Sequence, residues 1–337
     1  MNIIIDAMGG DNAPFAPLAG AAAAVQAYGV TVTAVGQLQQ MENVMQQHGI
    51  SAEGITLHHA ADVLSMDEDA TDVVRKKPDS SLAVAMKLLA DGTGEALVSA
   101  GSTGALLVGS TMLVKRIRGI KRAAIGTVMP GSEKPWMLID CGANVECRAE
   151  QLVQFAVMGS AYMEKVLGIK DPAVALANNG TEETKGTELQ LAAYPMLQNA
   201  GLNFVGNIEA RDIPTGAVAD VVVCDGFTGN IILKLVEGAA KMFAGMVKKM
   251  FYRNVGTKLA GLMMKGALAD FKKSFDYSEY GGAPLLGIKK PVIKAHGSSD
   301  DKAIMNAIRQ AKTCVENDVS AAIEGWIAQH KGEADDD

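Results

Sequence analysis

The sequence predicts an α/β protein whose largely parallel sheet is covered by helices on both faces. Short apolar runs recur along the chain, and nearly all of them stop at a turn that contains glycine, which is typical of buried strands. Between these runs lie stretches with apolar residues at three- and four-residue spacing, which indicates helices. Strands that alternate with helices in this way favour a parallel sheet between two layers of helices.

The expected elements follow one another along the chain. Strands are predicted at residues 2–5, 31–35, 96–100, 136–139, 173–177 and 221–224. Helices are predicted at residues 80–90 and 151–167, and an amphipathic run covers residues 231–243. Residues 12–41 carry no charge, but Gln26, Gly29 and several threonines and glutamines interrupt the apolar run. An alanine-rich helix followed by a buried strand explains this stretch better than a membrane span.

Size, charge and cysteine content limit the classes of protein to consider. With 337 residues, 48% of them hydrophobic, the chain can bury a core for one large catalytic unit, expected over residues 1–332 and followed by an acidic mobile tail at 333–337. A net charge of −7 without a basic arm argues against nucleic acid as a partner. The four cysteines form no C-x-x-C pair and no signal peptide is recognisable, so we expect free thiols and a cytoplasmic location.

The turns that follow the predicted strands are the expected binding region, because ligands of parallel sheets bind beyond the carboxyl ends of the strands. Glycine lets consecutive backbone N–H groups converge on an anion, and a following helix adds its positive end. The candidates for binding phosphate or substrate are Gly9, Gly10, Asp11, Gly101, Ser102, Thr103, Gly104, Asn144, Gly229 and Ser298. Any single turn of this kind can equally be a compact connection, but several of them at strand ends favour anion binding.

Five polar side chains on these turns are the candidates for catalysis. Lys185 can neutralise an anion, although most lysines are simply exposed. Asn230 can orient a bound oxygen or cap the helix that follows it. Asp6 and Asp225 each end an apolar strand, where a carboxylate either orients other groups or forms an Asx turn. His296 lies in a polar turn after an apolar strand.

Cofactor motifs are missing from these turns. No G-x-G-x-x-G or Walker A pattern follows any predicted strand, and neither an H-E-x-x-H motif nor a histidine cluster supports a metal. We therefore expect no cofactor and no catalytic metal.

A serine hydrolase is the main alternative. Ser102, Asp225 and His296 occur in the chain order of α/β-hydrolases, and residues 100–104 loosely resemble a nucleophile elbow. The first position of that elbow is alanine instead of glycine, which weakens this interpretation.

Residues 241–275 are predicted to form a basic amphipathic helical segment. Eight basic residues stand against one acidic residue between Lys241 and Lys273, inside an otherwise acidic protein. Such a helix can lie on an anionic membrane or dock an acidic carrier protein, and it can also simply pack an apolar face on the core. The expected contact residues are Lys258, Leu259, Leu262, Met263 and Lys265. A non-enzymatic membrane-binding module is therefore a further alternative.

Eight motifs occur in one order along essentially the whole chain. They are D-A-M-G-G-D, G-S-T-G-A, D-C-G-A-N, N-x-G-x-E-x-x-K-G, G-N-I-E-A-R-D-I-P, D-V-V-V-C-D-G-F-T-G-N, A-P-L-L-G-I and H-G-S-S. With them the chain resembles the bacterial phosphate acyltransferases of phospholipid synthesis, the PlsX-type acyl-phosphate synthases. The resemblance implies a three-layer α/β/α fold related to the isocitrate dehydrogenase and phosphotransacetylase group. It also implies a cytoplasmic homodimer that associates reversibly with the membrane.

The resemblance further implies that acyl carrier protein donates a fatty acyl group to inorganic phosphate. On this reading the glycine-rich backbone and Asn230 hold phosphate, Lys185 neutralises charge on phosphate or on the thioester oxygen, and Asp6, Asp225 and His296 orient these groups. Phosphate is already an anion and a thiolate is a tolerable leaving group, so no covalent intermediate is required. A downstream acyltransferase that uses acyl-phosphate is a further candidate partner, although no docking motif for it is recognisable.

Overall fold

The computed structural model describes residues 1–264, 266 and 281–330. Within these residues it contains a sheet of 11 strands in the order β3-β2-β1-β4-β11-β10-β5-β6-β9-β7-β8. The strands are β1 (Asn2–Asp6), β2 (Thr31–Gly36), β3 (Ile55–His59), β4 (Ala96–Ser99), β5 (Ala124–Met129), β6 (Trp136–Ile139), β7 (Val174–Asn178), β8 (Phe204–Glu209), β9 (Val221–Val223), β10 (Ala283–Leu286) and β11 (Val292–Lys294). All six strands predicted from the sequence are present, with ends that differ by no more than one residue.

Helices connect most of the strands. They are α1 (Phe15–Tyr28), α2 (Leu38–His48), α3 (Asp72–Arg75), α4 (Ser81–Asp91), α5 (Thr103–Gly109), the π-helical turn η1 (Ser110–Val114), α6 (Ala149–Leu167), α7 (Glu188–Gln198), the 3-10 turn η2 (Ile213–Thr215), α8 (Gly226–Phe251), α9 (Val255–Met263), α11 (Asp301–Glu316) and α12 (Val319–His330). The helices predicted at residues 80–90 and 151–167 correspond to α4 and α6, and the amphipathic run at 231–243 lies within α8.

The sheet separates two hydrophobic cores. Side chains alternate between the faces of a strand, so Ile3 and Ile5 of β1 belong to one core and Ile4 to the other. The first core packs against α1, α2, α6, α7, α11 and α12, and the second against α3, α4, α5 and part of α8. The predicted three-layer α/β/α fold with a largely parallel sheet is therefore confirmed.

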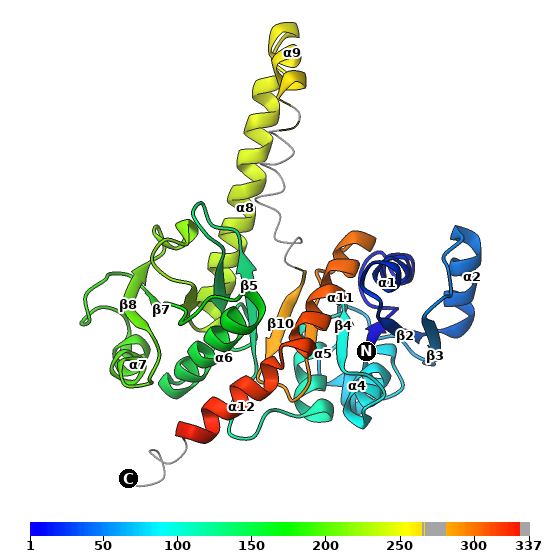
Figure 1. The fold of residues 1–337 in the computed structure, drawn as a ribbon, viewed down its shortest axis with the longest axis horizontal. Helices are drawn as coiled ribbons and strands as arrows, with labels where there is room; N and C mark the ends of the chain where they lie inside the picture. Colours follow the sequence, from blue (N-terminus) through cyan, green and yellow to red (C-terminus); the bar gives the residue numbers. More distant parts are fainter. Residues whose placement is uncertain (265, 267–280, 331–337) are drawn as a thin grey trace.

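The centre of the sheet is antiparallel, which the strand pattern did not predict. β10 runs antiparallel to β11 and to β5, and β5 runs antiparallel to β6. The parallel group β1, β2, β3, β4 and β11, here called the first half, therefore runs opposite to the parallel group β6, β7, β8 and β9, the second half. Figure 1 shows the two halves on either side of β5 and β10. The carboxyl ends of the strands in one half therefore point in the opposite direction to those in the other half.

One long helix leaves the body of the protein. Figure 1 shows α8 projecting outward with α9 at its far end. Near that end, Leu259, Leu262 and Met263 are exposed by 61%, 67% and 84%. Among the described residues, no helix has the combination of length and apolar character needed to cross a membrane. Lys265, residues 267–275 of the predicted basic segment and the predicted tail at 333–337 lie outside the described residues.

Candidate active site

A cavity of about 500 Å³ lies where the two halves of the sheet meet. Its lining includes Thr103, His296 and Ser298 from the first half, Thr127 from β5, and Gly142 and Asn230 from the second half. The turns that the sequence singled out come from strands that run in opposite directions. They reach one space because the register places the ends of β11 and β6 at nearly the same level: Lys294 pairs with Ala283, Leu285 with Ile125, and Gly126 with Ile139.

Asp6, at the end of β1, supports this region from below the surface. Its side chain is buried, and its carboxylate accepts hydrogen bonds from the hydroxyls of Ser81 and Ser99 at 2.7 and 2.8 Å and from the backbone N–H of Met8 at 3.3 Å. Burial raises the pKa of Asp6, and these hydrogen bonds oppose the change. Asp6 does not line the cavity. Its contacts instead fix β1 against α4 and β4.

The glycine turns after β1, β4 and β11 touch one another. A Cβ atom at position 9 would lie 2.6 Å from Oδ2 of Asp6 and 2.7 Å from the backbone nitrogen of Gly101, so a side chain there has no room. The backbone N–H of Asp11 donates a 2.8 Å hydrogen bond to the carbonyl of Gly297. The predicted phosphate-binding turns of the first half therefore form one continuous surface.

Within the turn after β4, the predicted residues have different positions. The Ser102 hydroxyl accepts a 3.5 Å hydrogen bond from the backbone N–H of Ala105 and caps α5. Thr103 follows it and lines the cavity. A Cβ at Gly104 would lie 3.1 Å from the Cβ of Ala70, so the loop before α3 covers this side of the turn.

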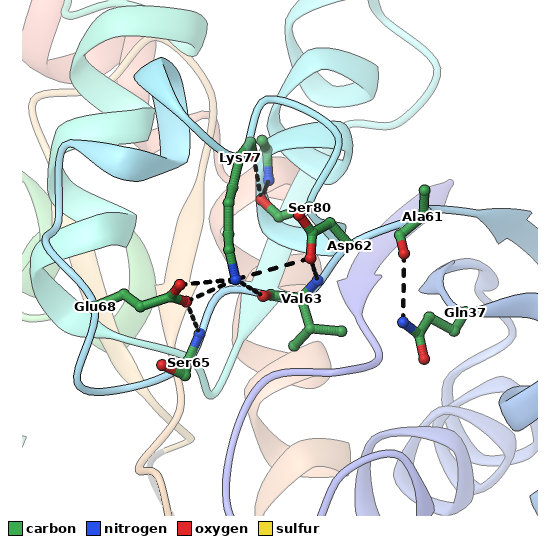
Figure 2. A network of polar contacts seen from close by, with 9 residues as sticks. Gln37, Ala61, Asp62, Val63, Ser65, Glu68, Lys77 and Ser80 are labelled. Carbon is green, nitrogen blue, oxygen red and sulfur yellow. Dashed lines mark hydrogen bonds and ion pairs between the residues drawn. The ribbon is translucent and has the colours of Figure 1, made fainter.

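Lys77 holds that loop in place, as Figure 2 shows. Its ammonium donates to the carbonyl of Val63 at 2.8 Å and forms an ion pair with Glu68 at 2.8 Å, while Asp62 lies 3.8 Å away. Glu68 in turn accepts from the backbone N–H of Ser65 at 2.7 Å. No sequence motif marks this lysine, which stabilises the loop beside the glycine turns and does not line the cavity.

His296 follows β11 and faces the cavity. Its Nδ1 accepts a 3.2 Å hydrogen bond from the backbone N–H of Ser298 and lies 2.8 Å from the hydroxyl of the same serine. Burial lowers the pKa of His296, so the ring is neutral at pH 7. Because Nδ1 acts as the acceptor, the proton of the neutral ring is on Nε2. The side chain thus offers a hydrogen-bond donor to a ligand.

On the other side of the cavity, the turn after β6 is built around the buried Asp140. Its carboxylate accepts from the backbone N–H groups of Ile125, Ala143 and Asn144 at 3.0, 3.1 and 2.7 Å. The Asn144 amide donates to the same carboxylate at 2.9 Å and to the Ala123 carbonyl at 2.8 Å. The side chain of Asn144 is buried in this network, whereas the predicted role was contact with substrate.

The turn after β9 leads into α8, and Asn230 lies near the N-terminus of that helix. Asp225 caps the helix by accepting from the backbone N–H and the hydroxyl of Thr228 at 2.9 and 2.7 Å. Gly229 is buried, and a Cβ there would lie 2.9 Å from Sγ of Cys224. This close packing brings the exposed Asn230 to the cavity beside Gly142.

The hydrolase alternative requires Ser102, Asp225 and His296 to form a hydrogen-bonded triad. In the described part of the chain these three side chains share no hydrogen bond. Ser102 caps α5, Asp225 caps α8, and His296 bonds to Ser298 through the nitrogen that a triad carboxylate would orient. The structure therefore does not assemble this triad.

Lys185 lies on an exposed loop after β7 and does not line the cavity. Its backbone carbonyl accepts a 3.1 Å hydrogen bond from the Asn178 amide, which closes the loop. Because β7 is parallel to β9, this loop and Asn230 both follow the carboxyl ends of their strands. Lys185 therefore lies at the same end of the strands as Asn230, with its side chain outside the cavity.

Lys294, the last residue of β11, lines the cavity but was not among the candidates from sequence, and neither were the lining residues Thr127, Lys234, Glu237 and Asp300. Lys294 lines the cavity although its side chain is buried. Its ammonium donates to the carbonyls of Ala100, at 3.3 Å, and Ala295. Burial lowers the pKa of Lys294 to about 8. A lysine that ends an apolar strand directly before H-G-S-S was the sequence signal that could have identified it.

Comparison with known proteins identifies the family. The family model described as "Fatty acid synthesis protein" matches residues 1–322. A phosphate acyltransferase of Clostridium botulinum (strain ATCC 19397 / Type A) is 46% identical over 325 residues, which cover 96% of this chain and 97% of the relative. A phosphate acyltransferase of Clostridium acetobutylicum is 47% identical over 320 residues, covering 95% and 96%.

Solved structures agree with the fold. A phosphotransacetylase from Streptococcus pyogenes has a TM-score of 0.62 at 19% identity, over 96% of this chain and 94% of that one. The EutD phosphotransacetylase from Staphylococcus aureus has a TM-score of 0.60 at 16% identity, over 94% of each chain. At these identities the likeness establishes the fold alone, while the sequence relatives establish the family. The chain belongs to the fatty acid synthesis protein family, among the phosphate acyltransferases of lipid synthesis.

Proposed function

We propose that the chain transfers a long-chain acyl group from acyl carrier protein to inorganic phosphate, which yields acyl-phosphate and free carrier protein for bacterial phospholipid synthesis. The observation that carries the proposal is the 500 Å³ cavity, in which Lys294, His296 and Asn230 line the same space. An ammonium, a neutral imidazole N–H and an amide are donors suited to phosphate and to the oxygen of a thioester.

The proposed reaction is a direct displacement. A phosphate oxygen attacks the thioester carbonyl carbon, a C–O bond forms, and the C–S bond breaks. The sulfur leaves as a thiolate and takes up the proton that phosphate loses. Negative charge gathers on the carbonyl oxygen in the transition state, so donors positioned beforehand at that oxygen supply the main acceleration.

We propose roles for the predicted residues within this scheme. Asn230 and the glycine turns hold phosphate, and Nε2 of His296 donates to the oxygen of the reacting group. Lys185 supplies a positive charge from the exposed loop after β7, near the end of β9 that leads to Asn230. In this scheme the bulky carrier protein binds on that side. Asp6 and Asp225 position the turns that carry the binding groups. This role is supported by the hydrogen bonds that Asp6 accepts from Ser99 and that Asp225 accepts from Thr228.

We propose that the end of α8 and α9 contacts an anionic membrane surface. The proposal is supported by exposed apolar side chains next to the basic residues Lys248, Lys249 and Lys258. Such a surface holds lipid through apolar burial and charge together. We also propose that the protein is cytoplasmic and forms a homodimer through the exposed apolar side of α8. Acyl carrier protein and a downstream acyltransferase that uses acyl-phosphate are its proposed docking partners.

Mass spectrometry of the products tests the proposed reaction. Purified protein is incubated with palmitoyl acyl carrier protein and ¹⁸O-labelled inorganic phosphate, with a Ser102→Ala variant in parallel. The proposal predicts labelled palmitoyl-phosphate from both proteins, because Ser102 supplies no nucleophile. Release of palmitic acid that needs Ser102 would establish the hydrolase instead. Binding of vesicles without any turnover would favour a membrane-binding module.

A further inference from the structure

Lys294 has an unusual setting for a lysine. Its side chain is only 9% exposed, yet it lines the cavity between the two halves of the sheet. In the part of the chain that the structure describes, its ammonium forms no ion pair with a carboxylate. Asp6 and Asp11 attract it only through space. An ammonium has three N–H donors, and the carbonyls of Ala100 and Ala295 occupy two of them.

A buried charge without a close counter-charge is costly, because burial removes the hydration that stabilises the charged form. Two neutral carbonyl groups compensate for this loss only in part. Buried ionisable groups of this kind cluster at functional sites, where a ligand can supply the missing charge. The remaining donor of Lys294 and the adjoining space therefore indicate an anionic ligand.

The position of the ammonium defines where this anion binds. Nζ is held at the carbonyls that end β4 and β11, which are the strands that lead into the turns of Gly101 and His296. Thr103 lines the same cavity and adds a hydroxyl donor, whereas the Ser298 hydroxyl donates to Nδ1 of His296 and holds that ring in place. Lys234 also lines the cavity but is ion-paired with Glu237 at 3.1 Å, so among the described lining residues Lys294 is the buried cation that has no paired carboxylate. A buried cation beside a short hydroxyl side chain suits a compact oxyanion such as phosphate better than a long acyl chain.

We propose that Lys294 is the principal phosphate-binding cation of this protein and holds inorganic phosphate at the carboxyl ends of β4 and β11. The inference rests on the proposed function for the identity of the ligand and assigns a charged partner to it inside the cavity. Lys185 is exposed and outside the cavity. The two lysines therefore act at different positions: Lys294 binds the nucleophile, and Lys185 acts at the entrance.

Lys290 provides a matched control in the same part of the chain. Its ammonium also donates to two main-chain carbonyls, those of Leu89 at 2.7 Å and Gly94 at 3.3 Å. It precedes β11, at the opposite end of the strand from Lys294, and does not line the cavity. A lysine that only fastens strand ends should behave like Lys290.

The experiment compares Lys294→Gln, Lys294→Arg and Lys290→Gln with the unchanged full-length protein. Glutamine keeps a donor for the carbonyls and removes the charge, whereas arginine keeps the charge. Phosphate binding is measured by ³¹P NMR titration without acyl donor, and KM values for phosphate and for palmitoyl acyl carrier protein are measured separately. Thermal unfolding of each variant, with and without phosphate, monitors folding and gives a second measure of binding.

We expect Lys294→Gln to raise the phosphate Kd and the phosphate KM by about 10- to 100-fold, the loss typical of a hydrogen bond to a charged group. The KM for the acyl donor should stay unchanged, Lys294→Arg should recover part of the binding, and Lys290→Gln should match the unchanged protein. An unaltered phosphate Kd in folded Lys294→Gln overturns the inference, as does an effect confined to the acyl-donor KM.

The two proposals can fail separately. Phosphate binding that depends on Lys294 without formation of acyl-phosphate would contradict the proposed function and support the phosphate site. Formation of acyl-phosphate with a normal phosphate KM in Lys294→Gln would support the proposed function and contradict the site. If the unchanged protein neither binds phosphate nor makes acyl-phosphate, both are wrong.

Discussion

The hydroxyl of Ser99 donates a 2.8 Å hydrogen bond to Oδ2 of Asp6, and this contact joins the carboxyl ends of β4 and β1. Ser99 also pairs with Lys294 across the β4–β11 register, so the bond supports the strand end that carries the cavity lysine. Asp6 itself is buried and touches no part of the cavity. Asp6 therefore contributes to the site by holding the ends of β1 and β4 in position.

Gly9→Ala should disrupt the site. The new Cβ would lie 2.6 Å from Oδ2 of Asp6 and 2.7 Å from the nitrogen of Gly101, so the two turns must separate. We expect a loss of about 1–3 kcal/mol in the free energy of unfolding and a raised phosphate KM. Urea denaturation and steady-state kinetics measure both.

Gly325→Ala is the matched control for that change. Gly325 is an exposed residue of α12, and a Cβ there meets nothing within 4 Å. Alanine favours a helix over glycine, so this variant should gain about 0.5–1 kcal/mol in stability and keep the phosphate KM. Equal behaviour of the two variants would show that the turns of Gly9 and Gly101 tolerate separation.

His296 should act as a neutral hydrogen-bond donor. Burial lowers its pKa, with Lys294, Lys234 and Lys241 lowering it further and Glu237 opposing them. The neutral form therefore prevails above the usual value of 6.5, and the acid limb of kcat/KM should lie below pH 6.5.

Substitutions separate this role from general acid or base catalysis. His296→Ala should lower kcat by about 100-fold, the usual loss for one donor to a developing oxyanion. His296→Gln keeps an N–H donor and should retain much more activity, with no acid limb. Equal inactivity of the glutamine and alanine variants would indicate that the imidazole transfers a proton.

The basic limb of the pH profile should belong to Lys294. Burial lowers its pKa to about 8, so the free protein carries the ammonium below that pH and loses it as the pH rises through 8. The value of kcat/KM for phosphate should therefore fall above pH 8, whereas kcat should not, because bound phosphate stabilises the charged form. The titratable and charged groups around it are Asp6, Asp11, Cys141, Lys234, Glu237, His296 and Asp300.

Lys294→Arg should remove this limb, since arginine keeps its proton throughout the range. Phosphate is a dianion above pH 8, so its own titration cannot imitate the effect. Burial raises the pKa of Cys141 to about 12, which removes this thiol as the source. A basic limb that stays at pH 8 in Lys294→Arg would assign the titration to another group.

The proposed membrane surface at the end of α8 and α9 can be tested with vesicles. Leu259→Asp combined with Leu262→Asp should weaken sedimentation with phosphatidylglycerol vesicles at least about tenfold, because each leucine contributes about 2 kcal/mol when buried in lipid. Leu191→Asp on α7 is the control, since Leu191 is also an exposed leucine. Unchanged binding of the double variant would exclude this surface.

Most of the fold could be predicted from the sequence because local patterns of apolar residues and glycine determine where its strands and helices lie. Short apolar runs such as residues 136–139 are too brief for a buried helix, and the glycine-bearing turn after them marks the end of a strand. The antiparallel centre was not predicted because β5 and β10 are far apart in the chain, and their pairing of Ile125 with Leu285 depends on tertiary contacts. β8 likewise has a weak local pattern, because Gly206 and Asn207 interrupt its apolar residues.

The site was predicted in part for the same reason. His296 lies on a turn and Asn230 near the start of α8, both in glycine-rich motifs that local sequence identifies, and both line the cavity. Lys294 ends a strand, and its burial follows from pairing with Ser99, nearly two hundred positions earlier in the chain. Asn144 looks like a ligand in sequence, yet its amide binds Asp140 and the Ala123 carbonyl. The burial of Lys294 and Asn144 depends on tertiary packing, which the residue type alone does not reveal.

The central claim is that phosphate itself accepts the acyl group, and the reaction without phosphate tests it most directly. The protein is mixed with palmitoyl acyl carrier protein in phosphate-free buffer, and intact masses of protein and carrier are followed before and after phosphate is added. Direct transfer predicts unmodified protein and no free carrier until phosphate is present, then one acyl-phosphate for each carrier released. Free palmitic acid or a palmitoylated protein formed before phosphate is added would contradict the account.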